Sequence, residues 1–366
     1  MRKEKIEMKD ARRVDRVDFY RRWIGEEGIP IIRDWYVEDI RKIPLEPWQR
    51  TGGLGAYLDL IGSADRTGAY ICEIPPGASL KPEKHLFEEL ICIVSGKGTA
   101  SVWNEGGPKR TFEWQEGSLF SPPLNSWHQL SNIQTDKPAR FFAVTGAPVF
   151  MNLFHNADFI FNNNFVFKDR YAGENDYFSE KGELVEISSR PVWEGNFIKD
   201  VRSFKIPSFE QMGKEMMWSN FELSENTMEA HISGFTPGTY KKAHRHSGGA
   251  FILILEGEGY SLTWPDLGAK RRFDWHDGSV IVPPEGWWHT HFILGNKPAF
   301  QLALRWDGTK YRFGKQWEYT LDVKKGGDQT EYADEDPEIR RMFEEELTKR
   351  GLKLRMDNSL YKRRDD

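Results

Sequence analysis

GSVIVPPEGWWH, residues 278–289, repeats an earlier stretch of the same chain, GSLFSPPLNSWH at residues 117–128. The offset between the two stretches is 161 residues, and matched positions outside them share it, among them Trp103 with Trp264. Many matches at one offset indicate an internal repeat, in which each copy is one folding unit. The chain is therefore predicted to contain two related units.

Each copy is a series of short, apolar, strand-like segments separated by Gly and Pro. GAYICEI (68–74) and ELICIVSGKGTASVW (89–103) belong to the first copy, and EAHISGF (229–235) and FILILEGEGYSLTW (251–264) belong to the second. No pattern of helical period interrupts either copy. Strands with this punctuation and spacing predict a sandwich or barrel. We therefore expect an all-β protein, with the two units related by a pseudo-twofold axis.

Composition excludes several classes of partner. The 366 residues suit two domains, and the net charge of −5 gives no attraction to nucleic acid or to an acidic membrane face. Cys72 and Cys92 are the two cysteines, too few for a disulfide framework. The chain shows no signal peptide at its start and no apolar run approaching the ~18 residues of a membrane span. We expect a cytoplasmic protein.

Histidines suggest a metal site in the second copy. His244 and His246 alternate along a strand, so both side chains point to one face. His289 begins a returning strand that can lie beside them, and His291 shares its face. Three imidazoles that converge in a barrel suit a divalent first-row metal. The alternative is a set of surface or hydrogen-bonded histidines without metal.

The first copy differs at these positions. His246 and His289 have counterparts in the repeat, but Glu83 stands where the second copy has His244, and Glu89 stands where it has Ala250. The residues of the first copy that could act together are Glu83, His85, Glu89 and His128. They form either a second metal site or a vestigial site whose polar groups pair with each other.

The spacings resemble the two motifs of the cupin superfamily. The first motif runs Gly, five residues, His-x-His, three or four residues, Glu, six residues, Gly. The second copy matches it from Gly238 to Gly257 without the glutamate, and the first copy matches it from Gly77 to Gly96 without the first histidine. The second motif, Gly, five residues, Pro-x-Gly, two residues, His, fits the second copy fully and the first with Asn125 for glycine.

The resemblance implies an architecture of two tandem cupin barrels, also called double-stranded β-helices or jelly rolls. A helical N-terminal arm precedes them, and EDPEIRRMFEEELTKRG near the C-terminus predicts a helix capped by Asp336. The expected division of the chain is arm 1–55, first cupin domain 56–160, linker 161–225, second cupin domain 226–325 and C-terminal helical tail 326–366.

Two-domain cupins with three histidines and no glutamate are most similar to the gentisate and salicylate 1,2-dioxygenase group. In that group HRH before small residues and a Trp-His-x-His segment are typical, and here they read HRHSGGAFILILEGEG and WWHTH. The resemblance implies Fe(II) and oxidative cleavage of a hydroxylated aromatic acid. One departure is that the working iron of that group lies in the N-terminal cupin, whereas the three-histidine set here lies in the C-terminal one.

These observations predict a non-haem Fe(II) dioxygenase that acts on a hydroxylated aromatic or enolisable carboxylate. His244, His246 and His289 are the predicted metal ligands, with Mn(II), Zn or Ni as other possible ions. His291 is the predicted acid or base, or else a hydrogen-bonded core histidine. The expected partners are a small-molecule substrate, O2 and further copies of the chain in a homo-oligomer.

Two alternatives remain open from the sequence. One is a cupin decarboxylase, lyase or isomerase that consumes no O2. The other is a storage or sugar-binding protein, which the retained histidines disfavour. Arg305 in the last strand of the second copy either contacts a substrate carboxylate or forms a structural ion pair.

Overall fold

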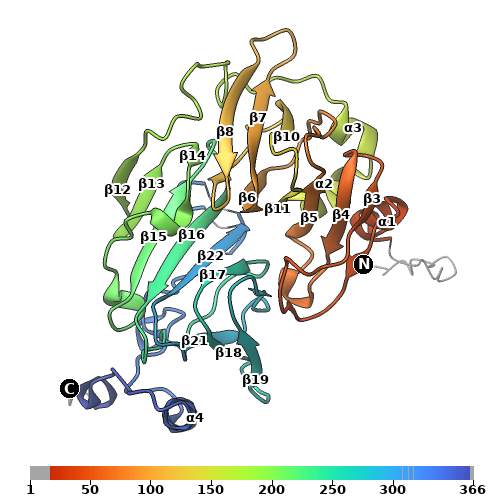
Figure 1. Cartoon of the computed structure of the whole chain (residues 1–366). Helices are drawn as coiled ribbons and strands as arrows, with labels where there is room; N and C mark the ends of the chain where they lie inside the picture. The colour runs from red at the N-terminus through yellow and green to blue at the C-terminus, as the bar shows by residue number, and fades with distance from the viewer. Residues whose placement is uncertain (1–16, 307, 312, 316, 363–366) are drawn as a thin grey trace, which may run out of the picture.

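Two β-barrels, one from each sequence copy, make up the body of the protein (Figure 1). The computed structural model describes residues 17–306, 308–311, 313–315 and 317–362. The strands of the first barrel are β5 (Gly68–Ile74), β6 (Glu89–Ser95), β7 (Lys97–Trp103), β8 (Arg110–Gln115), β9 (Leu119–Phe120), β10 (Trp127–Asn132) and β11 (Ala139–Thr145). The predicted all-β architecture of two tandem barrels is confirmed.

The second barrel repeats this order of strands. Its members are β15 (Met217–Glu222), β16 (Met228–Phe235), β17 (Phe251–Glu256), β18 (Gly259–Trp264), β19 (Arg271–Trp275), β20 (Val280–Ile281), β21 (Trp288–Ile293) and β22 (Ala299–Trp306). In each barrel a small three-stranded sheet, β10-β7-β8 or β19-β18-β21, faces a larger sheet. The register agrees as well, since Phe141 pairs with Cys72 in the first barrel and Gln301 pairs with Ser233 in the second.

Strands from the segments before and between the two sets just described extend the large sheets. Before the first barrel come α1 (Phe19–Glu26), β1 (Ile31–Ile32), β2 (Tyr36–Val37), β3 (Glu46–Trp48) and β4 (Gly53–Leu58). Between the barrels come α2 (Ala147–Phe154), α3 (Ala157–Phe161), β12 (Glu183–Ile187), β13 (Arg190–Glu194) and β14 (Phe197–Ile198). The described part of the N-terminal arm, from residue 17 onward, thus contains one helix and several short strands. The positions of the domain boundaries stay predictions.

Two of these strands cross to the other barrel. β2 from the arm pairs with β20 of the second barrel, and β14 from the linker pairs with β9 of the first. After each crossing strand an aspartate fits against a glycine turn: a Cβ added to Gly117 would lie 2.2 Å from Asp200 Oδ1, and one added to Gly278 would lie 2.6 Å from Asp39 Oδ1. Both glycines have φ of +86°, which also favours glycine. The barrels are therefore joined by a reciprocal exchange of strands.

The two large sheets also share a core. Apolar side chains from both barrels form one buried cluster, in which Phe142 of β11 lies against Phe251 of β17 with ring centroids 6.2 Å apart. Strands buried on both faces account for the continuous apolar runs in the sequence, such as FILIL at the start of β17. The inner face of each large sheet points into its own barrel, where apolar side chains surround a smaller group of buried polar residues.

The C-terminal helix, α4 (Pro337–Lys349), lies at the outer end of the second barrel (Figure 1). As predicted, Asp336 caps it: the side chain accepts a hydrogen bond from the backbone N–H of Glu338 at 3.0 Å. Ile339, Phe343 and Leu347 are its buried residues, and they pack on the barrel in one apolar cluster. None of the helices in the described part of the chain has the length and apolarity needed for a membrane crossing.

We predict that Asp336→Ala lowers the free energy of unfolding by about 1 kcal/mol, because an N-cap oxygen is lost. Asp336→Asn should keep most of the stability, since an amide oxygen also caps, although the ion pair of Asp336 with Lys270 is lost. Urea unfolding of the three proteins measures both effects. Equal losses in the two variants would contradict the capping role and assign the effect to the ion pair.

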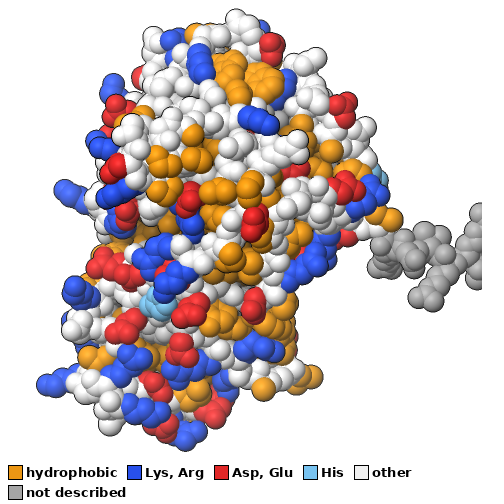
Figure 2. Space-filling model, turned by 45° about the vertical axis from the view of Figure 1, so that its right-hand side comes forward, with side chains coloured by type: hydrophobic (Ala, Val, Ile, Leu, Met, Phe, Trp, Pro, Cys, Tyr) orange, Lys and Arg blue, Asp and Glu red, His pale blue; other side chains and the backbone are white. Residues whose placement is uncertain are grey.

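On the face drawn in Figure 2, basic and acidic side chains are interspersed rather than gathered by sign. The absence of a nucleic-acid partner, the cytoplasmic location and the homo-oligomer all stay predictions.

Candidate metal centre

Three histidines meet inside the second barrel, as the sequence predicted. His244, His246 and His289 are each at most 5% exposed, and their ring nitrogens lie within 4.8 Å of one another. The backbone fixes this arrangement, since His244 and His289 form an antiparallel bridge with N–H···O distances of 3.1 and 2.9 Å. The N–H of Gly286 donates to the carbonyl of His246 at 3.0 Å. The turn that contains Gly286 therefore joins the two parts of the cluster.

The equivalent turn of the first barrel contains asparagine where the sequence motif has glycine. Asn125 takes the place of Gly286, with φ of +58° against +70°. Asparagine tolerates this left-handed conformation better than most residues. Its N–H donates to the carbonyl of His85 at 3.1 Å, as that of Gly286 does to His246. The motif therefore keeps its geometry in both barrels.

Backbone hydrogen bonds fix the tautomer of all three histidines. Nδ1 of His244 lies 3.0 Å from the carbonyl of Lys242, Nδ1 of His246 lies 2.7 Å from that of Ser247, and Nδ1 of His289 lies 3.1 Å from that of Trp287. A carbonyl only accepts, so each Nδ1 carries the proton and each Nε2 keeps its lone pair. Nε2 of His289 is buried without a hydrogen-bond partner among the described residues. These residues fit a divalent ion bound by three imidazoles.

Burial keeps the cluster neutral. It lowers the pKa of His289 to about 3, with a further contribution from the nearby Lys241. It also lowers the pKa of His244 and of His246 well below the ordinary value for histidine. Neutral imidazole is the form that binds metals. The cluster is therefore ready to accept an ion without first losing protons.

His291 lies beside the cluster but is not part of it. Its ring centroid is 5.7 Å from that of His289, and the residue is buried. Its Nδ1 lies 2.7 Å from Oγ of Ser261, which also accepts a hydrogen bond from Nε1 of Trp275 at 3.0 Å. If the hydroxyl of Ser261 donates its proton to Nδ1 of His291, then Trp275, Ser261 and Nδ1 all have hydrogen-bond partners, and the proton of His291 lies on Nε2. His291 is thus both hydrogen-bonded and next to the candidate metal site.

Arg305 forms an ion pair within the protein. It is 1% exposed, and its guanidinium donates to Oε1 of Glu229 at 3.2 Å and to the hydroxyl of Tyr319 at 2.8 Å. Of the two roles left open by the sequence, the structural ion pair is the one these contacts support.

The first barrel contains a second cluster, made of His85, Glu89 and His128. Nε2 of His85 lies 3.4 Å from Oε2 of Glu89, and Nε2 of His128 lies 3.6 Å from the same oxygen. Oε1 of Glu89 accepts a hydrogen bond from Tyr70. Burial raises the pKa of Glu89, but the hydrogen bonds from His85 and Tyr70 and the charges of His85 and His128 together outweigh it, so that the pKa lies below the usual value. Two histidines and a carboxylate are a possible metal set.

Glu83, the fourth residue named for the first barrel, lies slightly apart. It forms the bridge with His128 that His244 forms with His289, but its carboxylate pairs with Arg50. Its Oε1 lies 4.0 Å from Nε2 of His128. The first cluster therefore has internal ion pairs that the second lacks, and whether it binds a metal or is vestigial stays open.

A small cavity of about 10 Å³ adjoins the three histidines. This is roughly the space that one water molecule needs. Besides the histidines, its lining includes several polar side chains that the sequence comparison missed: His231, Ser233, Lys241 and Gln301. Burial, followed by the charge of Arg305, lowers the pKa of Lys241 to about 7. Among the described residues that line this cavity, none is acidic.

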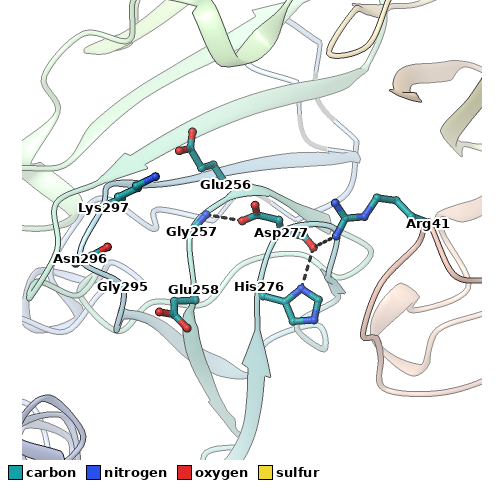
Figure 3. Close-up of a pocket in the computed structure, with 9 residues that line it drawn as sticks. All are labelled: Arg41, Glu256, Gly257, Glu258, His276, Asp277, Gly295, Asn296 and Lys297. Atoms are coloured by element: carbon teal, nitrogen blue, oxygen red, sulfur yellow. Dashed lines mark hydrogen bonds between the residues drawn. The ribbon is translucent and has the colours of Figure 1, made fainter. Parts of the chain in front are cut away.

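A larger hollow of about 430 Å³ lies elsewhere on the second barrel (Figure 3). Arg41 of the arm donates to the carbonyl of Asp277 at 2.6 Å, which holds the exchanged arm against the second barrel, and Oδ1 of Asp277 accepts from the N–H of Gly257 at 2.7 Å. Neither of the two clusters of candidate metal ligands borders this hollow. The site of chemical interest is therefore the small cavity beside the histidines.

Comparisons with known proteins agree with the class that this fold and these clusters define. Residues 70–145, which run from β5 to the end of β11, match the family described as Cupin domain. The match identifies the first barrel as a cupin domain, and the second barrel, which repeats its order of strands, is cupin-like, as the motif spacings predicted.

The individual proteins that resemble this chain do so over a short stretch or at low sequence identity. Gentisate 1,2-dioxygenase from a Ralstonia species is 34% identical over 68 residues, which are 19% of this chain and 18% of that protein. Among solved structures, Lactobacillus farciminis oxalate decarboxylase in a formate complex has a TM-score of 0.50 at 14% identity, with 74% of this chain and 85% of that chain covered. A mutant of Bacillus subtilis oxalate decarboxylase has a TM-score of 0.48 at 16% identity, with coverages of 74% and 76%. Such low identities to solved structures indicate a common fold alone.

Proposed function

We propose that the chain is a non-haem Fe(II) dioxygenase that acts on a carboxylate substrate bound at His244, His246 and His289. The observation that carries the proposal is the set of three buried, neutral Nε2 lone pairs beside a cavity whose described lining has no acidic residue. The short match to gentisate 1,2-dioxygenase supports the same class of reaction.

The ligand set favours this chemistry because it leaves the ion both charged and accessible. Three imidazoles would neutralise none of the 2+ charge of a bound ion and would leave it open to further ligands, such as an anionic substrate. When bound, the iron supplies a Lewis acid and a path for electrons between substrate and O2. Imidazole also suits Zn and Ni, and Mn(II) is a further candidate for the ion.

The protein residues have separate tasks in this proposal. The three histidines hold the ion, with their rings oriented by the backbone carbonyls that accept from Nδ1. His291 holds a proton on Nε2 near the substrate, where it can act as an acid and then as a base. Burial of the cluster within the barrel excludes bulk water.

We predict that Ser261→Ala leaves metal content unchanged but lowers turnover by about tenfold or more, part of the roughly 10²–10⁴-fold that a positioned acid or base contributes. The variant removes the hydroxyl that orients His291. The variant should also lower the free energy of unfolding by about 1–3 kcal/mol, since Trp275 and His291 stay buried without the hydroxyl as a hydrogen-bond partner. The fold tolerates the change, because Ala100 occupies this position in the first barrel. Metal analysis, turnover and urea unfolding check it, and unchanged turnover would assign Ser261 to packing alone.

The test of the proposed function is metal analysis followed by O2 uptake. Purified protein should contain iron, and Fe(II)-loaded protein should consume O2 with a hydroxylated aromatic or enolisable carboxylate from a substrate panel. An anaerobic assay separates the main alternative: turnover of the same substrate without O2 would replace the dioxygenase with a decarboxylase, lyase or isomerase. Protein that binds no divalent metal at this site would overturn both.

A further inference from the structure

Lys241 is a buried cation beside the candidate metal site. It is 5% exposed, it borders the same cavity as the three histidines, and none of its neighbours on that cavity is acidic among the described residues. No hydrogen bond or ion pair of its ammonium group occurs in the described parts of the chain, although its backbone is well paired. The carbonyl of Lys241 accepts from Oγ1 of Thr290, and its N–H donates to the carbonyl of His291 at 3.1 Å.

The first barrel shows that the fold does not require a lysine here. At the equivalent position the first copy has Leu80, which lines the corresponding cavity with Tyr70 and Phe141. In the second copy these positions are Lys241, His231 and Gln301, and all three line the second cavity. At these three positions the second cavity therefore has a lysine, a histidine and a glutamine where the first cavity has a leucine, a tyrosine and a phenylalanine.

The balance of charge in the second cavity indicates an anionic ligand. A buried ammonium without a partner is costly, and a divalent ion on three neutral imidazoles adds two more positive charges close by. The first cluster balances its charge internally, with Glu89 between its histidines and Glu83 paired with Arg50. The second cavity has no described carboxylate of its own, so an anionic ligand would supply the balance whenever Lys241 is protonated.

We propose that Lys241 is the docking point for a carboxylate group of the substrate in the second barrel, with Gln301 as a neutral hydrogen-bonding neighbour. This proposal rests on the proposed function for the location of the substrate, but it concerns binding and not the reaction. A carboxylate bound there lies within the same cavity as the three histidines, so its other donor groups can reach the metal. The substrate class is thus a small acid with a second oxygen donor.

The experiment is a calorimetric titration of metal-free protein, prepared with a chelator, against acetate, acetamide and chloride. Wild-type protein should bind acetate at one site per chain and should not bind the uncharged acetamide. Lys241→Met should weaken acetate binding by about 10–100-fold, the range for a hydrogen bond to a charged group, whereas Lys241→Arg should retain part of it.

Lys242→Met is the matched control. Lys242 is the adjacent residue, but its ammonium pairs with Glu331 at 2.6 Å and it does not line the cavity. This variant should bind acetate like the wild type. Near-ultraviolet circular dichroism verifies that each variant is folded, and Lys241→Gln is the second variant if Lys241→Met does not fold.

Three outcomes would overturn the proposal: no acetate binding by wild-type protein, equal acetate affinity in Lys241→Met or Lys241→Gln, or chloride that binds as well as acetate. The titration is also independent of the metal. His244→Ala should lose the ion and still bind acetate, so a failed metal site and a failed carboxylate site give different results.

Discussion

His244→Ala is expected to remove the metal ion of the second barrel and to abolish turnover. Two imidazoles remain, and the loss of a ligand should weaken metal binding by more than the roughly 10–100-fold typical of lost supporting contacts. Elemental analysis after dialysis should show one ion fewer per chain than in the wild type. His276→Ala is the control, because the side chain of His276 is 44% exposed and lies outside the cluster.

The same experiment decides between the two barrels. If His244→Ala keeps one ion and full activity, then the first cluster is the working site and the assignment is inverted. His85→Ala completes the comparison, since it removes a residue of the first cluster only. Two ions in the wild type and one in each variant would mean that both clusters bind metal. One ion in the wild type and in His85→Ala would mean that the first cluster is vestigial.

The fold and the three histidines could be predicted from the sequence because both leave strong local signals. The barrel recurs at a fixed offset, and the i, i+2 spacing predicts that His244 and His246 lie on one face of an extended segment. The structure brings the two side chains together, although the segment forms an isolated bridge at His244 and not a strand. His289 follows from the second copy of the same turn motif. These features depend on spacing within short segments, and spacing is what a sequence records directly.

The polar lining of the second cavity was missed for a different reason. His231, Lys241 and Gln301 come from separate strands or loops, and a single lysine or glutamine near a strand reads as a solvent-exposed position. Comparison of the two copies contained the signal, since Leu80 stands opposite Lys241 and Phe141 opposite Gln301. Histidine and glutamate are metal ligands and lysine is not, so differences between metal ligands in the two copies do not reveal Lys241.

The exchange of strands between barrels also lay beyond local signals. β2 and β14 are two residues long, too short for a hydrophobic period, and their partners are far away in the chain. The sequence does contain one signal of the crossing strands: VEDIR at 37–41 and IKDVR at 198–202 share the offset of the repeat. The repeated unit thus begins within the predicted arm and within the predicted linker, where charged residues and prolines hide it.

Arg305→Met is expected to lower the free energy of unfolding by about 3–5 kcal/mol, the cost of leaving one partner of a buried ion pair alone. Glu229 would stay buried at 1% exposure, with the hydrogen bonds from Thr309 to its Oε2 as remaining support. The double variant Arg305→Met with Glu229→Gln should recover most of the loss, because no buried charge is then left without its partner.

Urea unfolding of the wild type and of both variants measures these differences, and Arg272→Met provides the scale for a partly exposed pair, for which we expect about 1 kcal/mol or less. If Arg305→Met retains wild-type stability but loses acetate binding or turnover, then Arg305 contacts the substrate instead. That result would also weaken the assignment of Lys241, because two cations would then compete for one carboxylate. A large loss of stability that the double variant restores leaves Lys241 as the cation available to the substrate.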